Sequence, residues 1–184
     1  MQKIENLGCF FSDQGHNTYK TIRLGRRLWL AENLRLYCAV GSFGYGNSSS
    51  DVRVNGYLYA RDIIDSVCPQ GWILPSIEEY RQLYSAWKSK FHNLSFTEFA
   101  SGSSIDEIGR LPMSGIGELG QSLYDEANFA EIHKAAYFWT RSLDKAGNRK
   151  IFSISKNGSK DFSSEGRELC SVRLVHSFEK EEML

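Results

Sequence analysis

This 184-residue sequence has no excess of positive or negative charge. Lys and Arg together number 22, as do Asp and Glu, so the formal net charge at pH 7 is zero. Proteins that bind nucleic acid or anionic membranes usually carry a basic surface, so we expect no nucleic-acid partner. The only charge run is Glu179–Glu182, and residues 177–184 are predicted to be a solvated tail.

A long apolar run is also absent. A transmembrane helix needs about 20 mostly apolar residues, and no stretch approaches that, so we expect no membrane span. The opening residues MQKIENLGCFFSDQG do not resemble a secretory signal peptide. Leu7-Gly8-Cys9 faintly resembles a lipoprotein cleavage site, but it lacks an apolar stretch before it. Two interpretations stay open: a cytoplasmic protein, or one whose leader lies outside this numbering.

Cysteine and histidine spacings typical of metal sites are missing. The four cysteines, at positions 9, 38, 68 and 170, form no CxxC pair, which argues against a zinc knuckle or a thioredoxin-type site. The four histidines are scattered at positions 16, 92, 133 and 176. We therefore predict no metal site and no cofactor. The even cysteine count permits disulfides in an oxidising compartment.

Aromatic residues, by contrast, are plentiful. The chain has eleven Phe, nine Tyr and four Trp, which predicts a core built from rings. Residues 18–30 alternate between two faces around Gly25, which predicts a β-hairpin. Residues 40–51 are rich in Gly and Ser and predict a mobile loop, and residues 57–64 predict a short helix.

The strongest local signal begins at Pro75. Its ring disfavours helix for the residue before it, and Ser76 with Glu79 forms a capping-box pattern. Apolar residues then recur at spacings of three and four, at positions 77, 80, 83, 84, 87 and 91. We predict an amphipathic helix over residues 77–90, preceded by an extended segment from Cys68.

The second half of the chain predicts antiparallel strands joined by polar loops. Strands are expected over residues 136–141, 150–155 and 169–175, with an Asn157-Gly158 turn between the last two and irregular chain over 116–129. Shorter strand or turn segments are expected near 99–103 and 111–115. The expected fold class is α+β: a single domain over 1–184 in which two helices pack on a twisted antiparallel sheet with long irregular loops.

Several short motifs, taken in order, resemble one family. They are Asn17-Thr18-Tyr19-Lys20-Thr21, Trp29-Leu30-Ala31-Glu32-Asn33-Leu34, Gly56-Tyr57-Leu58-Tyr59, Cys68-Pro69-Gln70-Gly71-Trp72-Ile73-Leu74-Pro75-Ser76, Leu111-Pro112-Met113-Ser114-Gly115, Ala136-Tyr137-Phe138-Trp139-Thr140 and Ser171-Val172-Arg173. Over about residues 13–176 the chain resembles the Fibrobacter succinogenes major paralogous domain, which is found widely in Bacteroidetes and relatives. The resemblance implies a C-type lectin-like fold, related to formylglycine-generating enzymes, with paired first and last strands. It also implies a secreted or cell-surface location.

The sequence departs from that family in its last strand. The family usually carries a cysteine just after Val-Arg, where this chain has Leu174 and the nearest cysteine is Cys170. An even offset keeps the same face of a strand. The resemblance therefore leaves a shifted Cys68–Cys170 disulfide as an expectation.

The fold class places recognition on loops, so a non-enzymatic binding domain is the first functional interpretation. The expected surface comprises the loops around 114–128, 144–149 and 156–168. Its candidate ligand-binding residues are Tyr124, Asp125, Asn128, Asp144, Asn148, Arg149, Asn157 and Arg167. Tripeptides typical of calcium-dependent sugar binding are absent. A protein ligand is therefore favoured over a glycan.

Two alternatives follow from the resemblance. One is an oxidoreductase like the formylglycine-generating enzymes, whose paired thiols bind copper; only Cys170 lies in the matching region, so catalysis is not expected. The other is a receptor-binding protein of the phage or retroelement type, which would share the fold and lack a leader.

Overall fold

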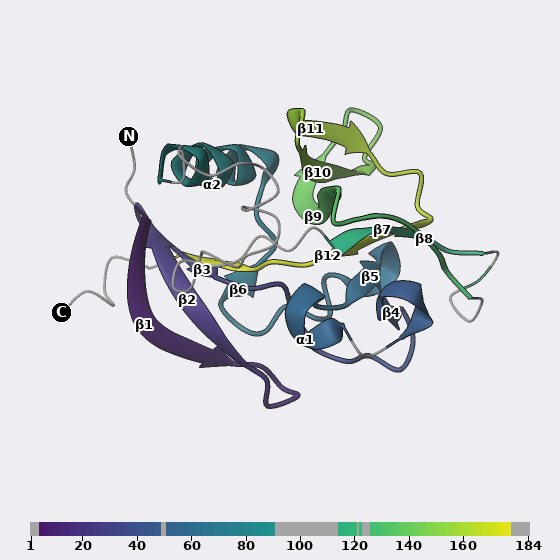
Figure 1. Ribbon diagram of the computed structural model, residues 1–184, viewed down its shortest axis with the longest axis horizontal. Coiled ribbons are helices and arrows are strands. Elements are labelled where there is room, and N and C mark those ends of the chain that lie inside the picture. The colour runs from purple at the N-terminus through teal and green to yellow at the C-terminus, as the bar shows by residue number, and fades with distance from the viewer. Residues whose placement is uncertain (1–3, 49–50, 91–113, 121, 123–125, 178–184) are drawn as a thin grey trace.

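The structure is a computed structural model that describes residues 4–48, 51–90, 114–120, 122 and 126–177. These residues form a mixed α+β arrangement of two β-sheets and two α-helices (Figure 1). The α+β class expected from the sequence is confirmed.

The first sheet is antiparallel and contains the expected hairpin. Its strands, in spatial order, are β1 (Ile4–Ser12), β2 (Thr18–Leu24), β3 (Arg27–Leu30), β13 (Val175–Ser177) and β6 (Trp72–Ile73). The turn between β2 and β3 places Gly25 at φ 58°, a left-handed conformation that glycine adopts without strain.

The second sheet contains a meander in the second half, but its third strand lies at 158–163, where the sequence predicts a loop over 156–168. Its order is β11 (Gly158–Ser163), β10 (Arg149–Ser155), β9 (Ala135–Leu143), β7 (Ser114–Glu118), β12 (Glu168–Ser171), β5 (Leu58–Ala60) and β4 (Ser42–Phe43), with β8 (Asn128–Ile132) also pairing with β7. Strands β9, β10 and β11 are consecutive antiparallel neighbours, and the predicted Asn157-Gly158 turn joins the last two.

Helix α2 spans Ile77–Lys90, as the sequence predicts. The capping box is formed in both directions: the Glu79 amide donates to Ser76 Oγ at 3.2 Å, and the Ser76 amide donates to Glu79 Oε2 at 2.7 Å. Glu79 also forms ion pairs with Arg27 of β3 and Arg141 of β9. One side chain therefore starts the helix and fastens it to both sheets.

The apolar face of α2 lies at the junction of the two sheets. The helix contacts β1 of the first sheet and β9, β10 and β11 of the second (Figure 1). The ring of Tyr80 stacks on Phe138 and on Phe152, with ring centroids 5.2 Å apart in each pair. Trp87 is fully buried in the same cluster. The expectation of a ring-rich core under this helix is confirmed.

The segment 57–64 is a strand and a turn, where the sequence predicts a helix. Residues 58–60 form β5, which pairs with β12 on one side and β4 on the other, and Arg61–Ile63 forms a 3₁₀ turn. All three strand residues are buried, so sheet pairing decides the conformation here. The second α-helix is instead α1, Val52–Asn55. The expected loop at 40–51 contains β4 and a 3₁₀ turn over Tyr45–Asn47.

The final predicted strand, 169–175, is divided between the sheets. Residues 168–171 form β12 in the second sheet and 175–177 form β13 in the first. Arg173 lies in the crossing segment with 0% exposure; its Nη2 donates to Asn33 Oδ1 at 2.9 Å, and its guanidinium lies 5.4 Å from the Trp87 ring centroid. Backbone hydrogen bonds hold the crossing segment on either side of Arg173, because the amides of Leu34 and Leu30 donate to the carbonyls of Val172 and Leu174 at 2.8 and 3.0 Å.

The first and last strands belong to one sheet but do not pair with each other, contrary to the expectation from the resemblance. Strand β13 pairs with β3 and β6, and two strands separate it from β1. The register places Ile4 opposite Leu24, and Ser177 opposite Arg27. Because Leu24 also faces Arg27 across the hairpin, both described chain ends lie at the same end of the sheet.

The expected irregular chain at 116–129 is partly regular, because Ser114–Glu118 pairs with Asn128–Ile132 as β7 and β8. The segments expected at 99–103 and 111–113 lie outside the described residues, as do Phe91 and residues 178–184 of the expected tail; Ser177 is the last residue of β13.

Candidate functional site

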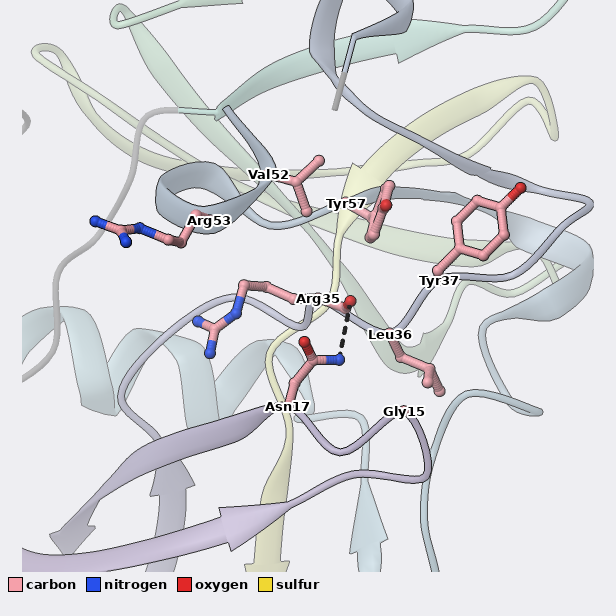
Figure 2. A pocket seen from close by; sticks show the side chains of 8 residues that line it. All are labelled: Gly15, Asn17, Arg35, Leu36, Tyr37, Val52, Arg53 and Tyr57. Carbon is pink, nitrogen blue, oxygen red and sulfur yellow. Dashed lines mark hydrogen bonds between the residues drawn. The ribbon is translucent and has the colours of Figure 1, made fainter. Parts of the chain in front are cut away.

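A pocket with a volume of about 570 Å³ lies between three separate segments of the chain (Figure 2). It is lined by Gly15, Asn17, Arg35, Leu36, Tyr37, Val52, Arg53 and Tyr57, and we call it the tyrosine groove. Its volume falls within the range of small-molecule sites, about 300–1,000 Å³. The segments are the β1–β2 turn, the stretch after β3, and α1 with the residue that precedes β5.

The β1–β2 turn is held by Asp13, which is 5% exposed. The backbone amides of Gly15 and Asn17 both donate to Asp13 Oδ1 at 2.9 Å. The Asn17 side-chain amide donates to the same carboxylate, and the Tyr19 hydroxyl donates to Oδ2 at 2.6 Å. A carboxylate that accepts this many hydrogen bonds fixes the turn and leaves little capacity to bind anything else.

The stretch after β3 is fastened to that turn. Asn17 Nδ2 donates to the Arg35 carbonyl at 3.2 Å (Figure 2), and the Arg35 amide donates to the Tyr19 hydroxyl at 2.8 Å. The Arg35 guanidinium lies 4.5 Å from the Tyr19 ring centroid, pairs with Glu32 and donates to the Thr18 carbonyl. Burial, followed by the hydrogen bond to Asp13, raises the pKa of Tyr19 well above its usual value. This wall of the groove is therefore ordered before any ligand arrives.

Two tyrosine rings form the opposite side. Tyr37 is 64% exposed, and its ring centroid lies 5.8 Å from that of the half-buried Tyr57 at an interplanar angle of 51°. Tyr57 contacts Tyr59 behind it at 6.3 Å, and the Tyr59 hydroxyl donates to the Leu36 carbonyl at 2.9 Å. Burial, with the neighbouring Tyr37, raises the pKa of Tyr57. The Tyr57 phenol is thus neutral at pH 7.

Gly56 makes the close approach of Tyr57 to the middle segment possible. Its φ is 76°, and a Cβ at this position would lie 2.7 Å from the Leu34 carbonyl oxygen and from Asn33 Cβ. The Tyr57 amide donates to that same carbonyl at 3.0 Å. No side chain fits there without movement of the backbone.

The groove is electrostatically asymmetric. Figure 2 shows the side chains of Arg35 and Arg53 extending to one side of the pocket, while the Tyr37 ring lies on the other. No carboxylate belongs to the described lining. Glu32 pairs with Arg35, whereas the exposed Arg53 forms no ion pair with any of the described residues.

The loop residues predicted as a ligand surface lie at three separate places. Asp144, Asn148 and Arg149 lie at the turn between β9 and β10. Asn157 lies at the opposite end of β10, in the turn between β10 and β11. Asn128 is paired opposite Glu118 in β8, and Arg167 donates to the carbonyls of Leu119 and Gly120. Tyr124 and Asp125 lie outside the described residues. The structure thus does not join the described members into one surface, because the length of β10 separates two of the turns.

Most of these loop side chains have structural partners. A hydrogen bond from the Ser163 side chain of β11, together with hydrogen bonds from Ala146 and Asn148 in its own turn, lowers the pKa of Asp144 to about 2. Arg149 pairs with Asp65 at 2.7 Å and donates to the Thr140 carbonyl. These contacts indicate that the side chains stabilise turns and strands.

Cys38, Cys68 and Cys170 are free thiols, so the expected Cys68–Cys170 bridge is not formed. The Cys68 thiol lies against the Ile64 carbonyl at 3.3 Å, and Cys170 is buried in β12. Burial raises the pKa of Cys68 to about 11 and that of Cys170 well above its ordinary value. Neither the Cys68 nor the Cys170 thiol therefore readily forms the reactive thiolate.

Within the described residues, no cluster of three or more His, Cys, Asp or Glu side chains is arranged to hold a metal ion. No helix in the described part of the chain is long and apolar enough to cross a membrane. Comparisons with protein-family models, curated proteins and solved structures give no match. The family resemblance noted in the sequence therefore stays a prediction.

Sequence reasoning did not identify the tyrosine groove. The only available signal was that Asn17 and Tyr57 fall within the short motifs on which the resemblance rests. Nothing in the sequence showed that residues 15–17, 35–37 and 52–57 would meet.

Proposed function

We propose that this protein is a non-enzymatic binding domain with a C-type lectin-like fold, and that the tyrosine groove is its recognition site for a protein ligand. The observation that carries this proposal is the combination of an ordered wall and exposed rings. Asp13, Asn17, Tyr19 and Arg35 hold each other in one network, while the Tyr37 ring is 64% exposed beside it. Preorganised sites lose less conformational entropy on binding, and exposed tyrosines are favoured at interfaces.

The chemistry of the groove supports binding over catalysis. A general base or nucleophile needs a partner that activates it. Here the Asp13 carboxylate already accepts hydrogen bonds from the Gly15 and Asn17 amides and the Tyr19 hydroxyl. The pKa of Tyr57 is raised rather than lowered. Tyr57 is therefore not suited to exchange protons near pH 7, and the hydrogen bonds to Asp13 leave that carboxylate little capacity to contact a substrate.

The oxidoreductase alternative is not supported by the thiols. Copper binding by that type of enzyme needs two accessible thiolates. Cys170 has 0% exposure and a pKa raised by burial. A surface or secreted location, which the resemblance implies, would fit a binding domain but is not needed for it.

The test is a site-resolved binding screen. A library of short peptides and a library of oligosaccharides would be added to ¹³C-tyrosine-labelled protein, and the ring resonances followed by NMR. We expect peptides to shift Tyr37 and Tyr57 while the resonances of Tyr80, buried under α2, stay in place.

A Tyr37→Ser variant provides the site control, since the exposed ring can be removed without opening the core. It should bind the selected peptides about tenfold more weakly, equivalent to about 1.4 kcal/mol. Ligands that leave both groove tyrosines unmoved and bind Tyr37→Ser normally would refute the site; turnover of any library member would refute the non-enzymatic assignment.

A further inference from the structure

We infer that the tyrosine groove recognises a carboxylate next to an apolar side chain in its protein ligand, with Arg53 as the group that contacts the anion. This inference rests on the proposed function and specifies the ligand chemistry of the same site. It follows from three features of the lining: a cation with no ion pair among the described residues, two phenol hydroxyls that can donate, and apolar side chains.

Arg53 is that cation. It lies on α1 with its side chain exposed at the rim of the pocket (Figure 2). Within the described residues its guanidinium forms no ion pair and no hydrogen bond, whereas Arg35 is held by Glu32 and by the Thr18 carbonyl. An exposed guanidinium beside an ordered pocket is suited to bidentate contact with a carboxylate.

Two hydroxyls in the groove can donate to a ligand. The hydroxyls of Tyr37 and Tyr57 have no hydrogen-bond partner among the described residues. A phenol hydroxyl can donate as well as accept, and an ionised carboxylate only accepts hydrogen bonds. The two hydroxyls and the Arg53 guanidinium can therefore all donate to a carboxylate.

The size of the charge favours a carboxylate over a phosphate. Two guanidiniums line the groove, Glu32 pairs with one of them, and the Asp13 carboxylate lies behind the β1–β2 turn, so no more than one positive charge is available to a ligand. A carboxylate carries one negative charge at pH 7, whereas a phosphate monoester carries about −1.5 to −2. A monoanion is therefore the matched ligand.

Apart from Gly15 and Asn17, the rest of the lining is aliphatic or aromatic. Val52 is buried in the wall, Leu36 is half-buried, and the two tyrosine rings meet at 51°. Rings at this angle form a notch and not the single flat face on which a pyranose stacks. A Leu or Phe side chain adjacent to the acidic residue would fill the notch, which favours a polypeptide ligand over a uronic acid.

The experiment uses matched peptide pairs and the whole protein. Acetylated, amidated pentapeptides with central Leu-Glu or Phe-Glu would be compared with their Leu-Gln and Phe-Gln counterparts by NMR titration and calorimetry. We expect the Glu peptides to bind at least tenfold more tightly, with an affinity that falls as salt is added. Arg53→Gln should remove that tenfold preference and leave the Gln peptides unaffected.

Arg26→Gln is the matched control, because Arg26 is also exposed but lies in the β2–β3 turn, at the end of β2 opposite the groove. It should bind like the wild type. Thermal unfolding of both variants should match the wild type, since neither side chain is buried.

The outcomes separate this inference from the proposed function. If Glu and Gln peptides shift Tyr37 and Tyr57 equally, the carboxylate inference is wrong and the binding site stands. Tighter binding of phosphotyrosine peptides, or of glucuronate oligosaccharides, would overturn it in favour of a dianion or a sugar acid. If no peptide or oligosaccharide shifts the groove tyrosines, both the inference and the proposed site fail.

Discussion

Tyrosine serves opposite purposes in two regions of this molecule. Under α2, Tyr80 is fully buried between Phe138 and Phe152, its hydroxyl lies 3.5 Å from the Arg173 carbonyl, and burial raises its pKa well above the usual value. In the groove, Tyr37 is 64% exposed, and its ring contacts the ring of Tyr57. The same side chain is structural in one place and available for recognition in the other.

The difference arises from what surrounds each ring. Tyr80 belongs to α2, and its ring is buried among side chains from both sheets. The groove lies where a hairpin turn meets the short helix α1, which is too short to cover Tyr37. Burial of a ring stabilises the fold by about 1.5–3 kcal/mol, whereas an exposed ring keeps its contact area for a partner. The predictions below test this contrast, beginning with the largest expected effect.

The largest effect is expected from Trp87→Ala. Removal of this fully buried ring should lower the free energy of unfolding by about 3–5 kcal/mol, because it leaves a large cavity under α2. Tyr37→Ser should change it by less than about 0.5 kcal/mol. Urea denaturation followed by circular dichroism measures both. Similar losses in the two variants would abolish the distinction between core and groove.

Alkaline pH should produce the next effect. Burial raises the pKa values of Tyr19, Tyr59 and Tyr80 above the value of about 10 found in unfolded chains. Their stabilisation is therefore complete below pH 10 and falls as the pH rises, by about 1 kcal/mol each between pH 10 and 11. Burial lowers the pKa of Arg173 to about 10, which acts in the opposite direction over the same interval.

The net loss should be about 2 kcal/mol between pH 10 and 11, measured by urea denaturation at each pH. Tyrosinate absorbance should show these three buried phenols ionising together with unfolding. Smooth ionisation of all tyrosines near pH 10 in the folded protein would contradict the burial described here.

Glu79→Ala should have a comparable but slightly smaller effect. It removes the capping box of α2 and both ion pairs, and we expect a loss of about 1–2 kcal/mol. Glu78→Ala is the matched control, because that carboxylate is exposed and its nearest cation, Arg81, is 3.8 Å away. Equal losses from the two substitutions would show that Glu79 does not join the helix to the sheets.

The smallest effect is expected at the loops. Asn157→Ser, in the β10–β11 turn, should alter the free energy of unfolding by less than about 0.5 kcal/mol and leave peptide binding unchanged. A loss of peptide binding would move the recognition surface from the groove to the loops that the sequence suggested.

Local signals in the sequence predicted the parts of the fold that are decided locally. The limits of α2 follow from Pro75, the Ser76–Glu79 box and a repeating apolar face, all within one segment. The β2–β3 hairpin follows from alternation around Gly25 in the same way. These elements needed no knowledge of distant residues.

Non-local pairing accounts for what the sequence did not predict. Residues 58–60 become a strand because β12, more than a hundred positions later, pairs with them. The chain leaves β12 for β13 at Arg173, where the side chain contacts Asn33 and Trp87. The groove has the same origin: its three walls are far apart in sequence, and Gly56 allows them to meet only once the fold has formed.

The most direct test of the account is a paired measurement on Tyr37→Ser. The dissociation constant for a peptide that shifts the groove tyrosines and the free energy of unfolding would both be determined for this variant and for the wild type. The account predicts that the dissociation constant rises about tenfold while the free energy of unfolding stays within about 0.5 kcal/mol. An unchanged dissociation constant, or weaker binding accompanied by an equal loss of stability, would contradict it.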